Sequence, residues 1–476
     1  MIKKIRTFFK EESSSAVKAG FYYFLCQMLV SGLSFLSTPI FTRLMDKAAY
    51  GAFSNFAAWE TVLIPIVTLN LRTTIAKSKY DFREKNDTYL SSILAISSIV
   101  TFAMYLVIEW NSVYFVTFFG MEMRYIRILF FYLILSPAFL YQQIQYRMYN
   151  KYRLFVMYAV LSAILRMGIS VVLVLILDDK FAGRVYGYVI PAMLIYLIIY
   201  IHIWVRGRKV NWDCCKYALK MAIPLIPSAL SASLLNSSDQ IMLTNMSGSK
   251  QTALYSIAYS VSSIAGVAWH ALNQAWGPWF YDKLDAEKFD DIRSGVKKFQ
   301  YGYILMIAGL MLIVPELVLI MGGKSYYEAI WVMPPVILAM ICQFYYSFYF
   351  NVEYFYGKTF LISFGTLLAA AVNIGLNFLL IPKWGYIAAA YTTLVGYLCM
   401  LIYHYLIVKF VVKKAFVYDN MLFVRTLLMA TLLQIIVAFL YNYPIIRYAL
   451  IGIYAVLFIW YVWTHRKMLL SKIKGK

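Results

Sequence analysis

Long apolar stretches of roughly 20 residues recur along the whole chain and are separated by short polar gaps. A helix that crosses the roughly 30 Å hydrocarbon core of a membrane needs about 20 mainly apolar residues, because each residue advances it by about 1.5 Å. About fourteen stretches satisfy this criterion. They cover residues 20–41, 51–71, 90–110, 126–148, 154–177, 185–205, 218–244, 253–280, 301–321, 331–350, 361–381, 385–408, 421–441 and 445–463. The pattern predicts an all-α polytopic membrane protein with about 14 transmembrane helices.

The composition supports this class of protein. Of the 476 residues, 62% are hydrophobic and 14% are charged, whereas a soluble domain is roughly a quarter charged. The net charge of +22 comes from Lys and Arg in short gaps between apolar stretches, so we expect no nucleic-acid partner. The sequence has no CxxC motif or other metal-ligand spacing and no catalytic constellation. We therefore expect no enzyme activity, no catalytic residue, no cofactor and no metal.

Basic residues gather in alternate gaps, beginning with the segment that precedes the first apolar stretch. Cytoplasmic loops of membrane proteins carry an excess of Lys and Arg. If the first gap is cytoplasmic, the gaps 72–85, 147–153, 206–220, 283–298 and 409–414 and the tail 466–476 are all cytoplasmic and rich in Lys and Arg. The pattern predicts a multi-pass protein of the cell membrane with both termini in the cytoplasm.

An internal repeat is visible when residues 40–57 are laid over residues 242–259 without a gap. Phe53 then stands over Tyr255, and Thr42 stands over Thr244. The match pairs the first two predicted helices with the seventh and eighth, as two similar six-helix lobes would require. We therefore expect an N-terminal lobe at 1–210, a C-terminal lobe at 211–415, and two further helices with a basic cytoplasmic tail at 416–476.

Four segments carry a resemblance to a known family. They read STPIFTRLMDKAAYGAFSNF (37–56), NLRTTIAK (70–77), IPLIPSALSASLLNSSDQIML (223–243) and ALYSIAYSVSSI (253–264). With these motifs the chain resembles the polysaccharide (oligosaccharide) flippases of the multidrug/oligosaccharidyl-lipid/polysaccharide exporter superfamily. It departs from the family pattern at Gln240, where an Arg commonly follows the Asp, and at Ala253, which replaces a Gly.

The resemblance implies two six-helix lobes around a central cavity, followed by two C-terminal helices. It implies a flippase that moves undecaprenyl-pyrophosphate-linked oligosaccharide repeat units across the cytoplasmic membrane by alternating access. The product would be a surface polysaccharide such as capsule, O-antigen or exopolysaccharide. Its partners would be the lipid-linked oligosaccharide, membrane lipids and other polysaccharide-assembly proteins, and we expect a monomer.

Arg166 and Glu60 lie near the middle of predicted helices in the N-terminal lobe. A charge at that depth costs roughly 2.5 to 3.5 kcal/mol and needs a partner or a wet cavity. Arg166 could present its charge to an anionic substrate while Glu60 orients it or exchanges a proton; alternatively, the two form an ion pair that only holds the lobe together. Arg43 and Arg72 could meet a pyrophosphate from either side, or could serve only as membrane anchors.

Polar residues of the seventh and eighth predicted helices are the other candidates for substrate binding. Asn236, Asp239 and Gln240 lie on the former, and His270, Asn273 and Gln274 share one face of the latter. These groups could bind sugar hydroxyls or could form hydrogen bonds between helices. His270 could also titrate near neutral pH and couple transport to protons, although a lone helical His can be purely structural.

Two other functions remain open. A cation-coupled multidrug exporter of the same superfamily would favour acidic residues in its cavity, and Arg166 argues against that alternative. A polytopic membrane enzyme of polysaccharide assembly would want a large outer loop or domain. The longest outer gap, 111–123, is short and largely apolar.

Overall fold

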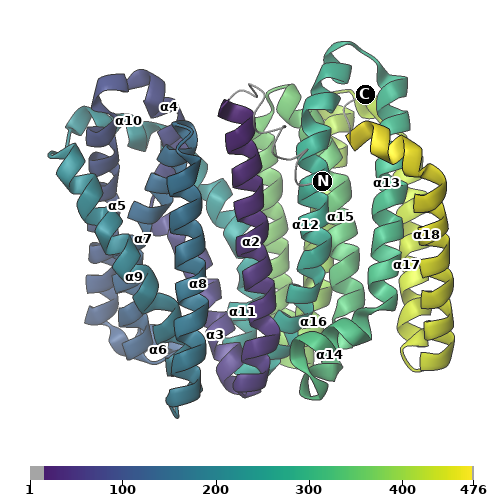
Figure 1. Cartoon of the computed structure of the whole chain (residues 1–476), viewed down its shortest axis with the longest axis horizontal. Helices are drawn as coiled ribbons and strands as arrows, with labels where there is room; N and C mark the ends of the chain where they lie inside the picture. Colours follow the sequence, from purple (N-terminus) through teal and green to yellow (C-terminus); the bar gives the residue numbers. More distant parts are fainter. Residues whose placement is uncertain (1–14, 474–476) are drawn as a thin grey trace, which may run out of the picture. The chain divides into compact units, whose positions relative to one another are not determined.

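The computed structural model describes the backbone of residues 15–473; it leaves undescribed the side chains before residue 22, several between 267 and 275, and most after 457. The regular elements of the described residues are all helical (Figure 1). In the first half of the chain they are α2 (Ser15–Leu44), α3 (Lys47–Val67), η1 (Leu71–Thr74), α4 (Ile75–Asp81), η2 (Arg83–Lys85), α5 (Asn86–Trp110), α6 (Ser112–Phe119), α7 (Met123–Met148), α8 (Tyr152–Ile176), α9 (Lys180–Gly207), α10 (Trp212–Ala222), η3 (Ile223–Leu225) and α11 (Ile226–Ser247). They continue with α12 (Ser249–Asp285), α13 (Phe289–Leu312), α14 (Val314–Gly322), η4 (Lys324–Trp331), α15 (Met333–Phe355), α16 (Thr359–Leu406), η5 (Ile407–Val411), η6 (Ala415–Val417), α17 (Asn420–Leu440) and α18 (Pro444–Ile473).

The expected number of fourteen spans is not confirmed. Among the described residues, nine helices are long and apolar enough to cross a membrane, or up to eleven if two bent helix pairs each count as one span. Two of the predicted stretches, 361–381 and 385–408, lie in α16 and the first residues of η5, and α16 is broken at Gly385 with φ 56°. The long helix α12 is not among the nine, and the described apolar part of α18 is shorter than a span.

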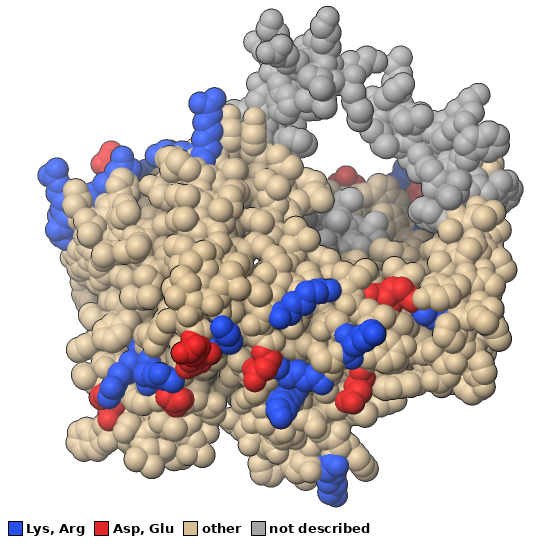
Figure 2. All heavy atoms as spheres, turned by 60° about the horizontal axis from the view of Figure 1, so that its bottom comes forward, with Lys and Arg blue, Asp and Glu red and all other residues tan. Residues whose placement is uncertain are grey.

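Large apolar side chains cover much of the helix surface, as a hydrocarbon environment requires. Ile99 of α5, Leu194 of α9 and Leu428 of α17 are each more than 60% exposed. Figure 2 shows Lys, Arg, Asp and Glu gathered in limited zones of the visible face, beside large areas that carry no charge. Together with the spans, this surface makes the chain a multi-pass membrane protein.

The helices form two compact units. Unit 1 consists of residues 1–256 with 374–386, and unit 2 of residues 257–373 with 387–476. The core of unit 1 is built from side chains that are entirely buried, such as Phe56 of α3, Leu129 of α7 and Val185 of α9. The lobe boundaries predicted from the repeat, at 210 and 415, stay predictions.

The two copies of the internal repeat have the same local structure. α2 ends at Leu44 and α3 begins at Lys47, while α11 ends at Ser247 and α12 begins at Ser249. The alignment places Lys47 over Ser249, so the second helix of each copy begins at the same aligned position. A Cβ on Gly51 would overlap the carbonyl of Ser249, so a residue without a side chain is needed where the two copies touch.

Candidate functional site

Helix α9 places two side chains beside α8 in the interior of unit 1. It begins after Asp179, whose carboxylate accepts a hydrogen bond from the N–H of Ala182 at 3.0 Å. A Cβ on Gly183 would lie 2.8 Å from the carbonyl oxygen of Leu173, and one on Gly187 would overlap the backbone of Ser170. These two glycines, four residues apart, let the α8 and α9 backbones touch.

Asp179 is also held from outside the helix. Burial pushes the pKa of Asp179 upward, but the Ala182 N–H, the Tyr125 hydroxyl and the charge of Arg124 together hold this pKa below its usual value. The Tyr125 hydroxyl donates to the carboxylate at 2.8 Å, and a nitrogen of Arg124 lies 3.1 Å from it. The start of α9 is therefore fixed by an ionised N-cap.

Glu60 of α3 and Arg166 of α8 lie close together, as the sequence suggested. Arg166 Nη2 lies 4.0 Å from Glu60 Oε1, at the limit of an ion pair. Two tyrosine hydroxyls fill the carboxylate's hydrogen-bonding positions: Tyr132 donates at 2.7 Å and Tyr188 donates at 2.9 Å. Glu60 is thus bound to α7 and α9 more tightly than to Arg166.

Arg166 is positioned mainly by Tyr188. Its Nε–H donates to the Tyr188 carbonyl at 3.1 Å, and its guanidinium carbon lies 3.5 Å from the centroid of the Tyr188 ring. Its buried Nη2 has no hydrogen-bond acceptor among the described residues. Arg166 therefore keeps donor capacity that a ligand could use.

Arg184 of α9 is a second buried cation in the same place. It is 8% exposed, and its guanidinium carbon lies 3.6 Å from the Phe41 ring centroid and 4.3 Å from that of Phe53. The side chain forms no ion pair and no hydrogen bond with the residues that the structure describes. Aromatic faces stabilise the charge here without consuming its five N–H donors.

Both arginines line a cavity of about 180 Å³ between α2, α8 and α9. Its walls include Ser34 and Ser37 of α2 and the ring of Tyr188. We call Glu60, Tyr132, Arg166, Arg184 and Tyr188 the arginine cluster. It holds two guanidinium groups and one carboxylate, so it carries a net positive charge inside a bundle of membrane-spanning helices. A group of this kind can bind an anion by charge-assisted hydrogen bonds.

The structure does not bring Arg43 or Arg72 into the arginine cluster. Arg43, in the last turn of α2, is exposed and donates to the Pro39 carbonyl of its own helix at 2.7 Å. Arg72 lies in η1 and is partly buried. A role in binding substrate remains a prediction for both residues.

Asp239 of α11 lies in a separate polar group of unit 1. It is 2% exposed and accepts hydrogen bonds from the Tyr255 hydroxyl and, at 2.6 Å, from Asn377 Nδ2. Asn236 is exposed and donates to the carbonyl of Ala232 on its own helix at 2.8 Å. Gln240 is partly buried. These contacts join α11 to α12 and α16.

Asn273 lies in unit 2, where its Oδ1 accepts a hydrogen bond from Asn351 of α15 at 3.4 Å. The nearby Trp269 Nε1 donates to Ser347 Oγ at 3.3 Å. The backbone of His270 and Gln274 belongs to α12, but their side chains lie outside the described residues. Their predicted common polar face therefore stays a prediction.

The hydropathy pattern did not identify Arg184 as a candidate site residue. The apolar stretch begins at residue 185, so hydropathy placed Arg184 just outside the helix. Because Asp179 caps α9, the helix begins at Lys180, and Arg184 lies one turn inside the helix. An Asp before a Gly-x-x-x-Gly motif was the signal that could have found it.

Comparisons with known proteins agree with this architecture. A model of the family described as polysaccharide biosynthesis protein matches residues 16–282. A search of curated proteins gave no match. Among solved structures, the chain is similar to lipid II flippase MurJ in an inward closed conformation, with 15% identity, a TM-score of 0.63, and coverage of 93% of this chain and 100% of that one.

Two transporter structures are also similar in fold. An inward-facing multidrug resistance MATE family transporter of the MOP superfamily has 14% identity and a TM-score of 0.59, covering 83% of this chain and 98% of its own. An outward-facing transporter of the same family has 12% identity and a TM-score of 0.52, and the match covers 85% of this chain and 97% of that one. These solved neighbours are named as a flippase and as transporters, not as enzymes, and the expected all-α membrane fold class is confirmed.

Proposed function

The chain belongs to the polysaccharide biosynthesis protein family, and we propose that it is a flippase for lipid-linked sugars. Its substrate would be an undecaprenyl-pyrophosphate-linked oligosaccharide repeat unit, which it would move across the cytoplasmic membrane by alternating access. The product would serve a surface polysaccharide: capsule, O-antigen or exopolysaccharide. Both termini would lie in the cytoplasm, as the distribution of Lys and Arg favours.

The observation that carries the proposal is the pair of buried guanidinium groups, Arg166 and Arg184, beside one cavity. Moving a pyrophosphate and many sugar hydroxyls through hydrocarbon without polar partners is very costly. Guanidinium groups offer the planar pairs of N–H donors that match phosphate oxygens. In the proposal, the head group moves past the arginine cluster while the polyprenyl tail remains in the lipid.

Glu60 would have a positioning role. The hydroxyls of Tyr132 and Tyr188 hold its carboxylate, and the ring of Tyr188 holds Arg166. Since Glu60 offsets only one of the two cations, Arg184 remains available to the substrate. This charge balance is opposite to that expected of a site for organic cations, which supports the flippase over the multidrug exporter.

The test is transport by the full chain in proteoliposomes that contain a lipid-linked oligosaccharide, with arrival of the sugar at the far leaflet measured by an added glycosidase. We expect Arg184→Gln and Arg166→Gln each to lower the initial rate by about tenfold or more, as loss of a charge-assisted hydrogen bond implies.

Arg127→Gln is the matched control, because Arg127 also lies on a membrane-spanning helix but is half exposed and paired with Glu109. Full transport by both cluster variants, at normal protein levels, would refute the proposal. Efflux of a lipophilic dye cation with no sugar transport would favour the multidrug exporter.

A further inference from the structure

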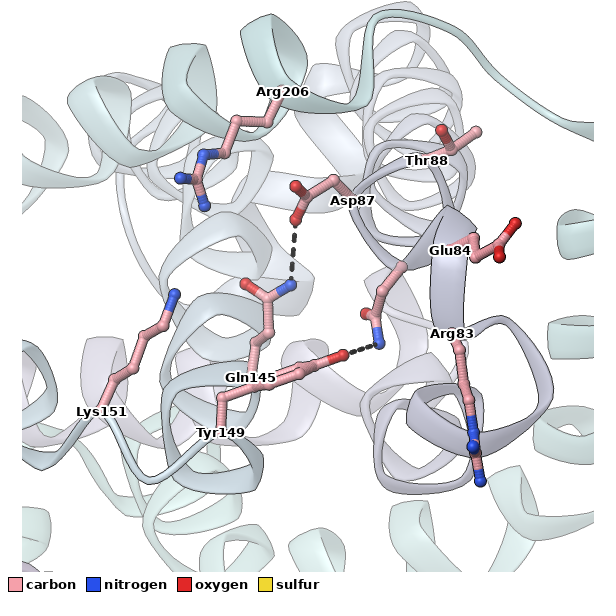
Figure 3. Close-up of a pocket in the computed structure, with 9 residues that line it drawn as sticks. Arg83, Glu84, Asp87, Thr88, Gln145, Tyr149, Lys151 and Arg206 are labelled. Atoms are coloured by element: carbon pink, nitrogen blue, oxygen red, sulfur yellow. Dashed lines mark hydrogen bonds between the residues drawn. The ribbon is translucent and has the colours of Figure 1, made fainter.

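A second polar pocket, of about 330 Å³, lies at one end of unit 1 among the ends of four helices (Figure 3). α5 and α8 begin there, and α7 and α9 end there. We call it the end pocket. Its volume is within the range of small-ligand sites. The same end carries the basic gaps 72–85, 147–153 and 206–220, so the charge pattern predicts that it lies at the cytoplasmic surface of the membrane.

Three cations line the end pocket: Arg83 of η2, Lys151 at the start of α8, and Arg206 in the last turn of α9. None of them forms an ion pair or a side-chain hydrogen bond in the described part of the chain. Figure 3 shows the guanidinium of Arg206 and the ammonium of Lys151 facing the same open space, whereas Arg83 points away from it. Two cations directed at one space repel each other, and an anion between them would relieve that repulsion.

Hydrogen-bond acceptors form the other side of the end pocket; Glu84 also lines the pocket, but Figure 3 shows it pointing away from the space between Arg206 and Lys151. The Asp87 carboxylate accepts one hydrogen bond, from Gln145 Nε2 at 3.2 Å. Asn86 is only 7% exposed, and its Nδ2 donates to the Tyr149 hydroxyl at 2.7 Å. Its buried Oδ1 has no donor among the described residues. An N–H group of a ligand would satisfy this oxygen and would also meet the negative charge of Asp87.

We propose that the end pocket binds the phosphoethanolamine head group of a membrane phospholipid. The phosphate would lie between Arg206 and Lys151, and the ammonium would donate to Asp87 and Asn86 Oδ1. This ligand carries one negative and one positive group, matching the two sides of the pocket. A purely anionic head group would leave Asp87 repelled and Asn86 Oδ1 unsatisfied.

The surroundings of the pocket favour a lipid over a free phosphate ester. Close to the pocket residues Lys151 and Arg206, helices α8 and α9 expose large apolar side chains along which acyl chains can lie. Leu154 is 39% exposed on α8, and Ile201 and Val205 are 53% and 67% exposed on α9. A lipid gains the burial of its acyl chains in addition to the head-group contacts. A choline lipid would gain the same apolar contacts, but its quaternary ammonium has no N–H group that could donate a hydrogen bond to Asn86 Oδ1.

The experiment measures lipid binding to the full-length chain in detergent by native mass spectrometry. The probes are phosphatidylethanolamine, phosphatidylcholine and phosphatidylglycerol of equal chain length, with glycerophosphoethanolamine as the head group without tails. We expect phosphatidylethanolamine to bind about tenfold more tightly than the other two lipids, and glycerophosphoethanolamine to bind much more weakly.

The double variant Arg206→Gln/Lys151→Gln should bind phosphatidylethanolamine no more tightly than the other two lipids. Asp87→Asn should weaken the binding of phosphatidylethanolamine and strengthen the binding of phosphatidylglycerol. The matched control, Arg153→Gln/Lys209→Gln, removes two exposed cations near the same end that do not line the pocket and should bind as the wild type does. Elution of each variant as one symmetric peak checks folding.

Three results would overturn the proposal. The first is an unchanged preference in the double variant, which would place binding elsewhere. The second is equal binding of all three lipids by the wild type, which would mean that the pocket does not select the head group. The third is glycerophosphoethanolamine binding as tightly as the lipid, which would make the ligand a soluble phosphate ester.

Discussion

The guanidinium carbon of Arg184 lies 3.6 Å from the centroid of the Phe41 ring, so the first helix of the described chain covers a buried cation of α9. Phe53 of α3 lies on the same guanidinium at 4.3 Å. Stacking of this kind is worth about 2 kcal/mol when the groups are desolvated, and it requires a planar cation. Arg184 is therefore held in place by shape and charge together, and it retains its hydrogen-bond donors.

Replacing Arg184 separates these two contributions. Arg184→Lys keeps the positive charge but loses the planar fork of donors, whereas Arg184→Gln loses both. We expect the initial rate of sugar transport in proteoliposomes to fall about tenfold in the Gln variant and less in the Lys variant. Equal losses in the two variants would indicate that the stacked shape, and not the charge, matters at this position.

Asp179 makes the start of α9 sensitive to acid. Its pKa in the folded chain is below the usual value, so its stabilising contribution is complete above the unfolded pKa of about 3.9 and is lost as the pH falls through the folded pKa. Asp179→Ala should lower stability by about 1 kcal/mol at pH 7, through loss of the N-cap. Thermal unfolding in detergent should show this difference shrinking below about pH 4; a constant difference would contradict the assignment.

The contact between α8 and α9 predicts opposite effects for two glycines. A Cβ on Gly187 would overlap the backbone of Ser170, whereas one on Gly168 of α8 has open space around it. Gly187→Ala should cost about 1 to 3 kcal/mol by overpacking. Gly168→Ala, the matched control, should be neutral or should stabilise by up to about 1 kcal/mol. Melting temperatures of the two purified variants test this, and a neutral Gly187→Ala would mean that the helices can separate freely.

Hydropathy predicted the helices of this fold well but not where every span begins and ends. The stretches 361–381 and 385–408 both proved helical, yet they belong to one long helix that is broken at Gly385. Hydropathy reports whether a segment suits lipid, and both halves do. It cannot report a backbone torsion, which is why the count of spans was less reliable than the class of fold.

The pairing of Glu60 with Arg166 could be predicted because each is an isolated charge deep in an apolar stretch, where an unpaired ion is costly. The partners that hold the pair could not be predicted. Tyr132 and Tyr188 are two of 42 tyrosines, and nothing in the sequence distinguishes a tyrosine that contacts a carboxylate from one that faces lipid. Such contacts depend on helix rotation, which packing determines.

Glu353 and His404 illustrate the same limit in unit 2. They are 51 residues apart in sequence, on α15 and α16, and both side chains are completely buried. His404 Nδ1 lies 2.8 Å from Glu353 Oε1, and the ring of Tyr346 stacks on the imidazole. Glu353 Oε2 and His404 Nε2 have no hydrogen-bond partners among the described residues. The two side chains therefore depend on each other.

A double-mutant cycle tests this dependence. Glu353→Leu leaves a buried imidazole without its hydrogen-bond partner, and His404→Leu leaves a buried carboxyl group without its partner, so each should destabilise unit 2 by about 1 to 3 kcal/mol. The double variant removes both polar groups and should cost much less than the sum of the two single changes. Ser363→Ala, at a partly exposed position on α16, is the control for the effect of a substitution away from the pair. Additive losses in thermal unfolding would show that each side chain is stabilised by something other than its partner, and the pair would then have no energetic coupling.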